Sequence, residues 1–462
     1  MKPIKNFSRL AVVLTAAQLI AAPMFAARGK ADFRTFVTLG DSLTVGISNQ
    51  AGVITHQQFS WPAVFARQVG LRTDCTAAND APDCFQQAVI SEPGYLPELV
   101  LTSLSPLGIG LKPGLGSPLN STLARPYNNL AVDGAEIADA LNVDGDGNEK
   151  FSAPIVLRGQ GSVVEQAVRL NPTFIGAWFG ADDFFGPLQA GNPAGLTPTA
   201  DFTRDYGTVL DKLIAGAPNA GIVVGNLPGD VRSLPFVNLL PTILIDPSTN
   251  KPVLDPSGKP IALVADLGGG KFGQLPPGSA ILFTSIGLLR SGYGIPAALK
   301  PLLPNLPDVG KPLPDAAVLT PDEITAFNAR IAEYNATINT LAAARNIPVV
   351  DLNSYFTKAK AGISVGPISY NLGYITGGLI SIDSAHPTDV GYVLIANEFI
   401  RTVNQAYGTR IPVASIAQTF QNNDPSTLAN VFVGTNAKFD FLPDITPEAL
   451  AVLRGEVPES EQ

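Results

Sequence analysis

Four short, continuously apolar runs, separated by segments with helical patterns, constrain the fold of this chain more than any other feature. The runs are Phe36–Leu39, Phe174–Trp178, Gly221–Val224 and Ile347–Val350. Strands of this kind are buried on both faces, as in a parallel sheet that helices cover on both sides. The pattern predicts a three-layer α/β domain, in which reactive groups gather on loops at the carboxyl ends of the strands.

The clearest helix is expected over Thr320–Arg345. Thr320 is the cap, Pro321 lies in the first turn, and Glu323 completes a capping box. Apolar residues then recur every three or four positions, which predicts one stripe packed against the sheet. Further helices are expected at about 60–69, 201–214 and 387–404.

Two long stretches, at about 70–125 and 228–314, interrupt the alternation of strands and helices. In the second stretch, the apolar runs Ile243–Ile245 and Ile261–Val264 flank a turn-rich segment and predict a hairpin. Long insertions form lids or substrate walls, and structural padding over a sheet edge is the alternative. We expect a main domain over residues 28–410 that contains both insertions, followed by a C-terminal tail over 411–462.

The N-terminal residues 1–27 have the features of a secretory signal peptide. Lys2, Lys5 and Arg9 precede an apolar run from Leu10 to Phe25. An uncleaved N-terminal anchor is the alternative. The expected location is therefore secreted or periplasmic, and no cysteine lies near the cleavage point to carry a lipid. No other stretch is long and apolar enough to span a bilayer.

The charge and the cysteine content exclude several classes of function. A net charge of -9 without a basic stripe argues against nucleic-acid binding. Cys75 and Cys84 are the only cysteines, and in an exported protein we expect them to form a disulfide. The run Asp144–Asn148 has the look of a calcium loop, but Glu149 stands where that loop needs glycine, so we expect a solvated turn. We expect no metal and no other cofactor.

Ser42 and His386 are the candidate catalytic residues. Ser42 follows the first apolar run directly, in the sequence Gly40-Asp41-Ser42-Leu43. His386 is one of only two histidines and lies three residues after Asp383. A serine hydroxyl becomes a good nucleophile when a base takes its proton and a third group orients that base. Ser42, His386 and Asp383 therefore predict a serine hydrolase. His56 belongs to no motif, and we expect it on an exposed loop.

The order of these motifs resembles the GDSL, or SGNH, hydrolase family. Besides the serine and histidine motifs, the resemblance includes a glycine block at 128–135 and a block at 178–183. It implies a flavodoxin-like α/β domain, an acyl-enzyme mechanism without a cofactor, and an oxyanion hole. The oxyanion donors would be the backbone N–H groups of Ser42 and Gly134, with a third group at residue 182.

One residue departs from the family pattern. Asp182 stands where the family has asparagine. An amide donates a hydrogen bond, whereas an ionised carboxylate only accepts one and would repel the oxyanion. Either burial and the neighbouring Asp183 keep Asp182 protonated, since burial favours the neutral form, or the enzyme is weak or works differently. The first hypothesis predicts an active enzyme that favours mildly acidic pH.

The sequence thus predicts an exported esterase or lipase acting on lipid or other small acyl esters, with transient contact to a lipid surface. Apolar insertions favour acyl chains as substrates. Two alternatives stay open. One is a binding or surface protein that keeps the fold after Asp182 disabled the oxyanion hole, and the other is a polysaccharide O-deacetylase.

Overall fold

A parallel four-stranded sheet forms the centre of the protein in this computed structural model, which describes residues 26–104, 107–143, 152–246, 248–417, 442–454 and 456. The strand order is β1-β4-β5-β12. Their bounds are Phe36–Gly40 for β1, Phe174–Trp178 for β4, Gly221–Gly225 for β5 and Val349–Val350 for β12. The predicted parallel sheet is confirmed. The last strand is shorter than expected because Pro348 has no N–H group to extend the ladder.

The glycine block supplies a fifth extended segment along the edge of β1. The N–H of Thr38 donates to Asn128 O at 2.8 Å, that of Leu130 to Thr38 O at 2.9 Å, and that of Val132 to Gly40 O at 3.0 Å. This segment precedes β4 in the chain and lies outside β1 in space. The resulting order, second segment, β1, β4, β5, β12, is the flavodoxin-like order 2-1-3-4-5.

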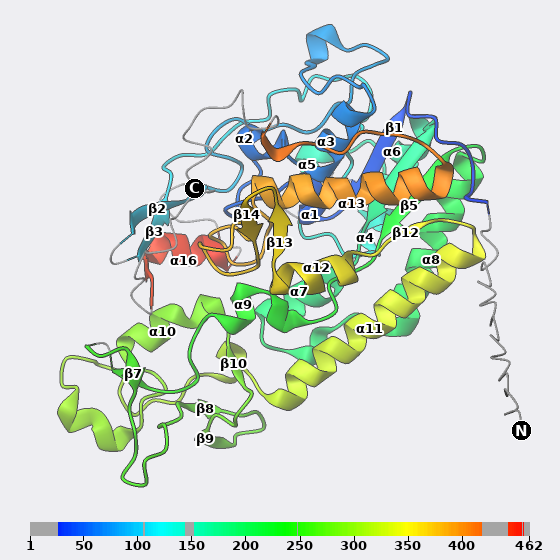
Figure 1. Ribbon diagram of the computed structural model, residues 1–462. Helices are drawn as coiled ribbons and strands as arrows, with labels where there is room; N and C mark the ends of the chain where they lie inside the picture. Colours follow the sequence, from blue (N-terminus) through cyan, green and yellow to red (C-terminus); the bar gives the residue numbers. More distant parts are fainter. Residues whose placement is uncertain are drawn as a thin grey trace, which may run out of the picture.

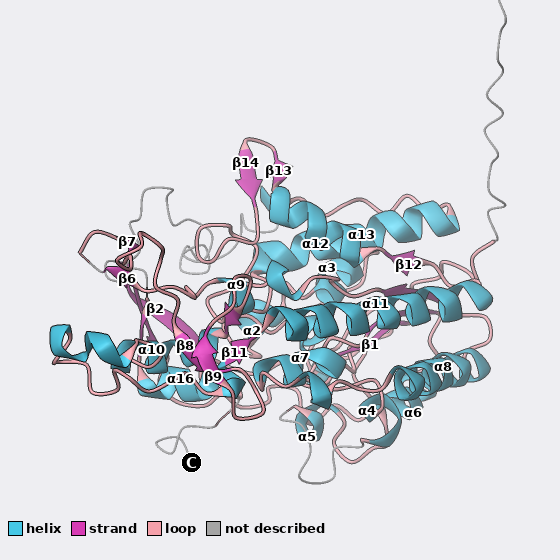
Figure 2. Ribbon diagram, turned by 90° about the horizontal axis from the view of Figure 1, so that it is seen from below, coloured by secondary structure: helices cyan, strands magenta, loops and turns pink. Residues whose placement is uncertain are grey.

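Helices cover both faces of the sheet, so the domain has three layers (Figures 1 and 2). Successive strand residues enter opposite cores, with Phe174 packed on one face and Ile175 on the other. The Phe174 face is covered by α3 (Trp61–Gln68), α12 (Leu352–Ala361) and α13 (Asp389–Tyr407). The Ile175 face is covered by α6 (Val163–Arg169), α8 (Thr199–Gly216) and α11 (Pro321–Ala344). Full burial of one such apolar side chain stabilises the fold by roughly 1.5–3 kcal/mol.

The four predicted helices form within a few residues of their expected bounds. At the start of α11, the Thr320 hydroxyl accepts from Glu323 N at 3.3 Å, and the Glu323 carboxylate accepts from Thr320 N at 2.7 Å. This is the predicted capping box. Four one-turn helices lie between these longer elements: α2 (Ile54–Gln57), α4 (Asp139–Asn142), α5 (Ala153–Val156) and α9 (Pro235–Asn238).

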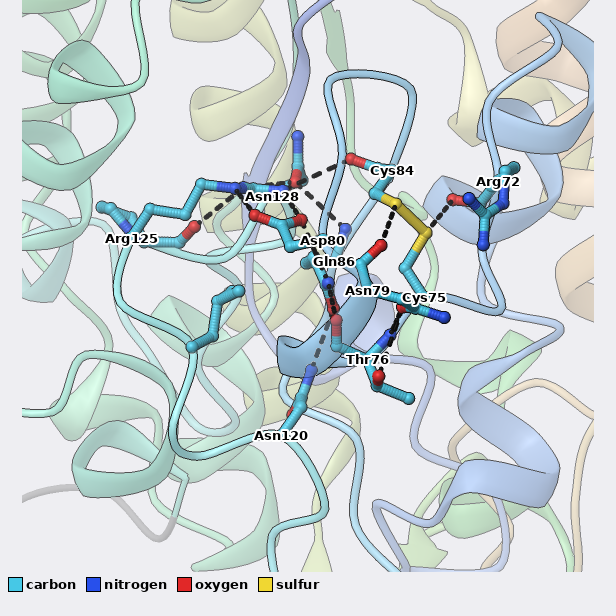
Figure 3. Close-up of polar contacts among 12 residues, drawn as sticks. Arg72, Cys75, Thr76, Asn79, Asp80, Cys84, Gln86, Asn120, Arg125 and Asn128 are labelled. Atoms are coloured by element: carbon cyan, nitrogen blue, oxygen red, sulfur yellow. Dashed lines mark hydrogen bonds and ion pairs between the residues drawn. A yellow bond between two sulfur atoms is a disulfide. The ribbon is translucent and has the colours of Figure 1, made fainter.

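The first insertion contains the disulfide and a hairpin. Cys75 and Cys84 are bonded, with their Cα atoms 5.9 Å apart, as predicted. Beside the disulfide, the Arg125 guanidinium makes an ion pair with Asp80 at 2.8 Å (Figure 3). Further along, β2 (Leu99–Leu104) pairs antiparallel with β3 (Leu107–Leu111).

The second insertion contains the predicted hairpin with an additional strand folded into it. Ile243 bridges Ala262 in antiparallel fashion, and Leu244 N donates to Ile261 O at 2.8 Å. The additional strand is β7 (Lys251–Pro252), which lies between the two runs and pairs antiparallel with β6 (Ile245–Asp246) at the end of the first run. The other elements of this insertion are β8 (Val264–Asp266), β9 (Phe272–Gln274), β10 (Ala280–Ile281) and α10 (Ile286–Ser291). After the insertion, β11 (Val318–Leu319) pairs with β10. After α12, β13 (Ile363–Val365) and β14 (Ile368–Tyr370) form a separate hairpin.

The end of the C-terminal tail joins the two insertions. Strand β15 (Asp444–Ile445) pairs parallel with β3, and α16 (Pro447–Leu453) follows it. Arg290 of α10 makes an ion pair with Asp444, and Arg454 donates to Thr284 O at 3.4 Å. Figures 1 and 2 show α10 and α16 at the same end of the molecule.

Two predictions fall outside the described part of the chain. These are residues 1–25 of the expected signal peptide and the calcium-like run at 144–149. Within the ranges that the structure describes, no helix is long and apolar enough to cross a membrane.

Candidate active site

Ser42 is the first residue of a one-turn helix, α1 (Ser42–Val45), which only Asp41 separates from β1. The Asp41 carboxylate caps this helix by accepting from Leu43 N at 3.0 Å, and its other oxygen accepts from Ala181 N at 3.3 Å. Asp41 thereby ties the Ser42 turn to the loop after β4. Gly40 makes the sharp turn possible, because a Cβ there would lie 2.4 Å from Trp178 O.

The structure brings Ser42 and His386 together, although 344 positions separate them in the chain. His386 Nε2 lies 3.0 Å from Ser42 Oγ, and His386 Nδ1 lies 3.0 Å from Asp383 Oδ2. Asp383 Oδ1 accepts from the backbone N–H groups of Ala385 and His386, both at 2.9 Å. All three residues are buried. Their arrangement allows a proton to pass from Ser42 to an imidazole that Asp383 orients.

The electrostatics of Ser42, His386 and Asp383 suit a histidine base paired with an ionised aspartate. Burial favours the neutral form of Asp383, but the charge and hydrogen bond of His386, with the two N–H groups, lower the pKa of Asp383. Burial also opposes the charged form of His386. The charge and hydrogen bond of Asp383 outweigh that effect and raise the pKa of His386 above its usual value, with further contributions from Asp133 and Asp41. Burial raises the pKa of Asp41 to about 7.

The predicted oxyanion residues Gly134 and Asp182 lie on the loops that flank Ser42. Gly134 has φ +72°, and its segment follows the hydrogen bond from Val132 N to Gly40 O. Asp182 is the first residue of α7 (Asp182–Gln189), directly after the Ala181 N–H that Asp41 holds. The loops after three adjacent parallel segments therefore meet at one edge of the sheet, as expected for such a fold.

The prediction that His56 lies on an exposed loop is wrong. His56 is only 3% exposed and lies in α2, between the Asp389 carboxylate at 2.8 Å and the Glu98 carboxylate at 3.0 Å. Burial alone would lower its pKa, but these two carboxylates raise the pKa of His56 to about 10. The error arose because Glu98 and Asp389 lie 42 and 333 positions from His56, and no local pattern indicates either contact.

Tyr95 is a further polar residue near the site that carries no sequence signal. Its hydroxyl donates to the carboxylate of Asp133, the residue before Gly134. Burial raises the pKa of Tyr95 well above its usual value, and the charges of Asp133 and Asp182 add to this. The first insertion thus contributes a side chain beside the predicted oxyanion loop. The only sequence signal for this role is that Tyr95 lies inside an insertion expected to form a lid or a substrate wall.

A central parallel α/β sheet, with serine, histidine and aspartate in one row at its edge, is the architecture of the SGNH hydrolases. The chain belongs to the GDSL-like lipase/acylhydrolase family, whose model matches residues 36–399. The match includes all four motifs that carried the resemblance and both long insertions.

Solved structures with a similar fold include three esterase-type proteins. A putative GDSL-like lipase from Parabacteroides merdae is 11% identical, with 83% of this chain and 98% of that chain covered and a TM-score of 0.34. Phospholipase A1 from Streptomyces albidoflavus is 15% identical, with 82% and 100% covered and a TM-score of 0.31. A family 3 carbohydrate esterase from Clostridium thermocellum is 13% identical, with 81% and 96% covered and a TM-score of 0.32. A search of curated protein sequences gave no match.

Proposed function

We propose that this protein is an exported serine hydrolase that cleaves carboxylic esters through an acyl-enzyme intermediate. One observation carries the proposal: His386 lies 3.0 Å from Ser42 Oγ on one side and 3.0 Å from Asp383 on the other. Membership of the GDSL-like lipase/acylhydrolase family supports it. The signal-like N-terminal sequence and the Cys75–Cys84 disulfide, a bond typical of oxidising compartments, support export.

In the proposed reaction, Ser42 Oγ attacks the ester carbonyl while His386 Nε2 takes the hydroxyl proton. Asp383 keeps the His386 Nδ1–H in place and stabilises the imidazolium. When the tetrahedral intermediate collapses, His386 gives the proton to the leaving alcohol. Water then attacks the acyl-enzyme by the same route in reverse and regenerates Ser42.

The oxyanion would be bound by the backbone N–H groups of Ser42 and Gly134 and by protonated Asp182. Such donors act in a partly buried site, where one well-placed hydrogen bond is worth roughly 10²–10³ in rate. In its ionised form Asp182 would oppose the same charge. The proposal therefore includes the earlier hypothesis that Asp182 acts as a donor when it carries a proton.

The substrate class that we propose is a lipid ester or another small acyl ester. Extensive apolar segments in both insertions favour an acyl chain over a sugar as the recognised group. A panel of p-nitrophenyl esters from acetate to palmitate, beside acetylated xylan, separates a lipase or esterase from a polysaccharide deacetylase.

Covalent labelling with a fluorophosphonate probe tests the serine hydrolase directly. We expect labelling of the wild type, loss of labelling in Ser42→Ala, and strong slowing in His386→Gln. Asp182 in place of asparagine favours one rival, a binding protein with a disabled site. Absence of labelling in a folded wild type between pH 5 and pH 9 would support that rival.

A further inference from the structure

A tight turn between α1 and α2 contains two successive residues in the left-handed backbone region. Asn49 has φ +53° and Gln50 has φ +64°. The flanking residues Ser48 and Ala51 bond to each other in both directions, at 3.3 and 3.0 Å. Left-handed backbone costs a residue with a side chain roughly 1–2 kcal/mol, so surrounding contacts must hold this turn.

The turn delivers a backbone donor to the predicted catalytic acid. The N–H of Gln50 donates to Asp383 Oδ2 at 2.8 Å. This is the same oxygen that lies 3.0 Å from His386 Nδ1. The Gln50 N–H therefore fixes the position of the oxygen that orients the imidazole.

The side chain and backbone of Asn49 hold the turn from two directions, and the residue is only 2% exposed. Toward the first insertion, Asn49 Nδ2 donates to Glu98 Oε1 at 3.2 Å, and Asn49 O accepts from Leu99 N at 3.0 Å. Toward the segment before Asp383, Asn49 N donates to Ser381 Oγ at 3.0 Å, and Asn49 Oδ1 accepts from Ile382 N at 3.4 Å. Asn49 thus connects the first insertion to the segment that precedes Asp383 and His386.

Buried charges fix the far end of this connection. Glu98 Oε1 also binds His56 Nε2 at 3.0 Å, while His56 Nδ1 binds Asp389 at 2.8 Å. Asp389 is the first residue of α13, three positions after His386. Lys112 Nζ lies 3.3 Å from the other Glu98 oxygen. Removing one member of such a set leaves an uncompensated buried charge, so the cluster holds Glu98 in one position.

We propose that Asn49, held by Glu98 and His56, is a positioning residue that keeps the Gln50 N–H on Asp383. This inference rests on the proposed serine hydrolase function. It also assigns a role in positioning to the first insertion, because Glu98 lies in that insertion, directly before β2. Misplacing a reacting group by about 1 Å can cost roughly 10²-fold in rate, so a loose turn would slow the chemical step.

Steady-state kinetics on p-nitrophenyl acetate test the proposal. We expect Asn49→Gly, which tolerates the left-handed backbone but lacks the side chain, to lower kcat roughly 10- to 100-fold with KM within about twofold. Glu98→Ala should lower kcat in the same way. Glu98→Gln retains an oxygen that can accept from Asn49 and should restore most of that loss. Unchanged KM with lowered kcat distinguishes positioning of the triad from a damaged substrate site.

Asn346→Gly is the matched control for the loss of an asparagine side chain at a left-handed backbone position. Asn346 has φ +56°, is exposed, and precedes β12 at the amino end of that strand, away from the site. Asn346→Gly should keep wild-type kcat. If Asn49→Gly and Glu98→Ala, measured on folded protein, keep wild-type kcat while the wild type labels at Ser42, the positioning role is wrong and the hydrolase stands. If the wild type shows no Ser42-dependent labelling, the hydrolase fails and the positioning role fails with it.

Discussion

Asp182→Asn is the substitution that most directly tests the proposed oxyanion hole. The change replaces one carboxylate oxygen by an amide nitrogen of nearly the same size. The loop should keep its place, because the preceding Ala181 N–H is held by Asp41 at 3.3 Å and Asp182 begins α7. The variant therefore changes the chemistry at this position without a large change of geometry.

The magnitude follows from the number of donors. In the proposed oxyanion hole, Ser42 and Gly134 would supply two backbone N–H groups whether or not residue 182 donates. One missing donor costs roughly 10²–10³ in rate, or about 2.7–4 kcal/mol of transition-state stabilisation. Asn donates at every pH, whereas Asp182 donates only when protonated. We expect the ratio of kcat/KM between Asp182→Asn and wild type to be a few-fold at pH 5 and to approach roughly 10²-fold at pH 8.

The ratio is the informative quantity because it removes the contribution of the base. His386 must be neutral to accept the Ser42 proton, and its pKa is raised by Asp383. Both enzymes should therefore lose activity as the pH falls through the raised His386 pKa, and that loss cancels in the ratio. Asp322→Asn, a change in the exposed first turn of α11, should give a ratio near one at every pH. A ratio near one for Asp182→Asn from pH 5 to pH 8 would refute the idea that a protonated Asp182 donates to the oxyanion.

Three further predictions concern stability. Burial raises the pKa of Asp183 to about 7. The folded protein therefore binds more protons at Asp183 than the unfolded chain does, and the free energy of unfolding falls as the pH rises from about 4 to 7. Asp183→Asn removes this loss, so between pH 5 and pH 8 its free energy of unfolding, measured with urea, should gain on the order of 2–4 kcal/mol relative to wild type. The disulfide closes a loop with a separation of 9 residues, and the double change Cys75→Ser/Cys84→Ser should lower the free energy of unfolding by about 2.5 kcal/mol. Truncation before Asp444 removes β15, which pairs with β3, and the buried side of α16. It should lower Tm and speed proteolysis in both insertions. Equal Tm and equal cleavage rates would show that the tail does not stabilise the two insertions.

The sequence predicted the parts of this protein that depend on local patterns. The apolar runs located β1, β4 and β5, and Thr320 with Glu323 located the start of α11. The capping box and the strand period are set by neighbours a few residues apart, so the sequence contains them directly. The motifs of the family resemblance placed Ser42, Asp383 and His386 on one site, and the structure brings these three side chains within hydrogen-bonding distance.

The residues that the sequence did not predict are those whose role comes from the first insertion. His56, Asn49 and Tyr95 each acquire their partners from residues that are distant in sequence or lie inside that insertion. An isolated histidine, an asparagine in a loop and a tyrosine after a glycine have no periodicity that would indicate these contacts. The sequence also contains no indication that the tail pairs with β3, since this contact spans more than 300 positions.

These contacts give the first insertion a physical role in the proposed chemistry. Ser42 and His386 lie more than 300 positions apart in the chain, so the segment around each of them must be held rigidly. The rate depends on the two hydrogen bonds that join Ser42 to His386 and His386 to Asp383. The sheet fixes Ser42 through β1 and Asp41. The Asp383–His386 turn lies in a loop and contains a left-handed residue, Ser384, so it needs support from outside its own chain segment. The 48–51 turn provides this support through Gln50, and Glu98 connects it to the insertion. On the proposed positioning role, the precision of the candidate triad depends on the first insertion as well as on the sheet that holds Ser42.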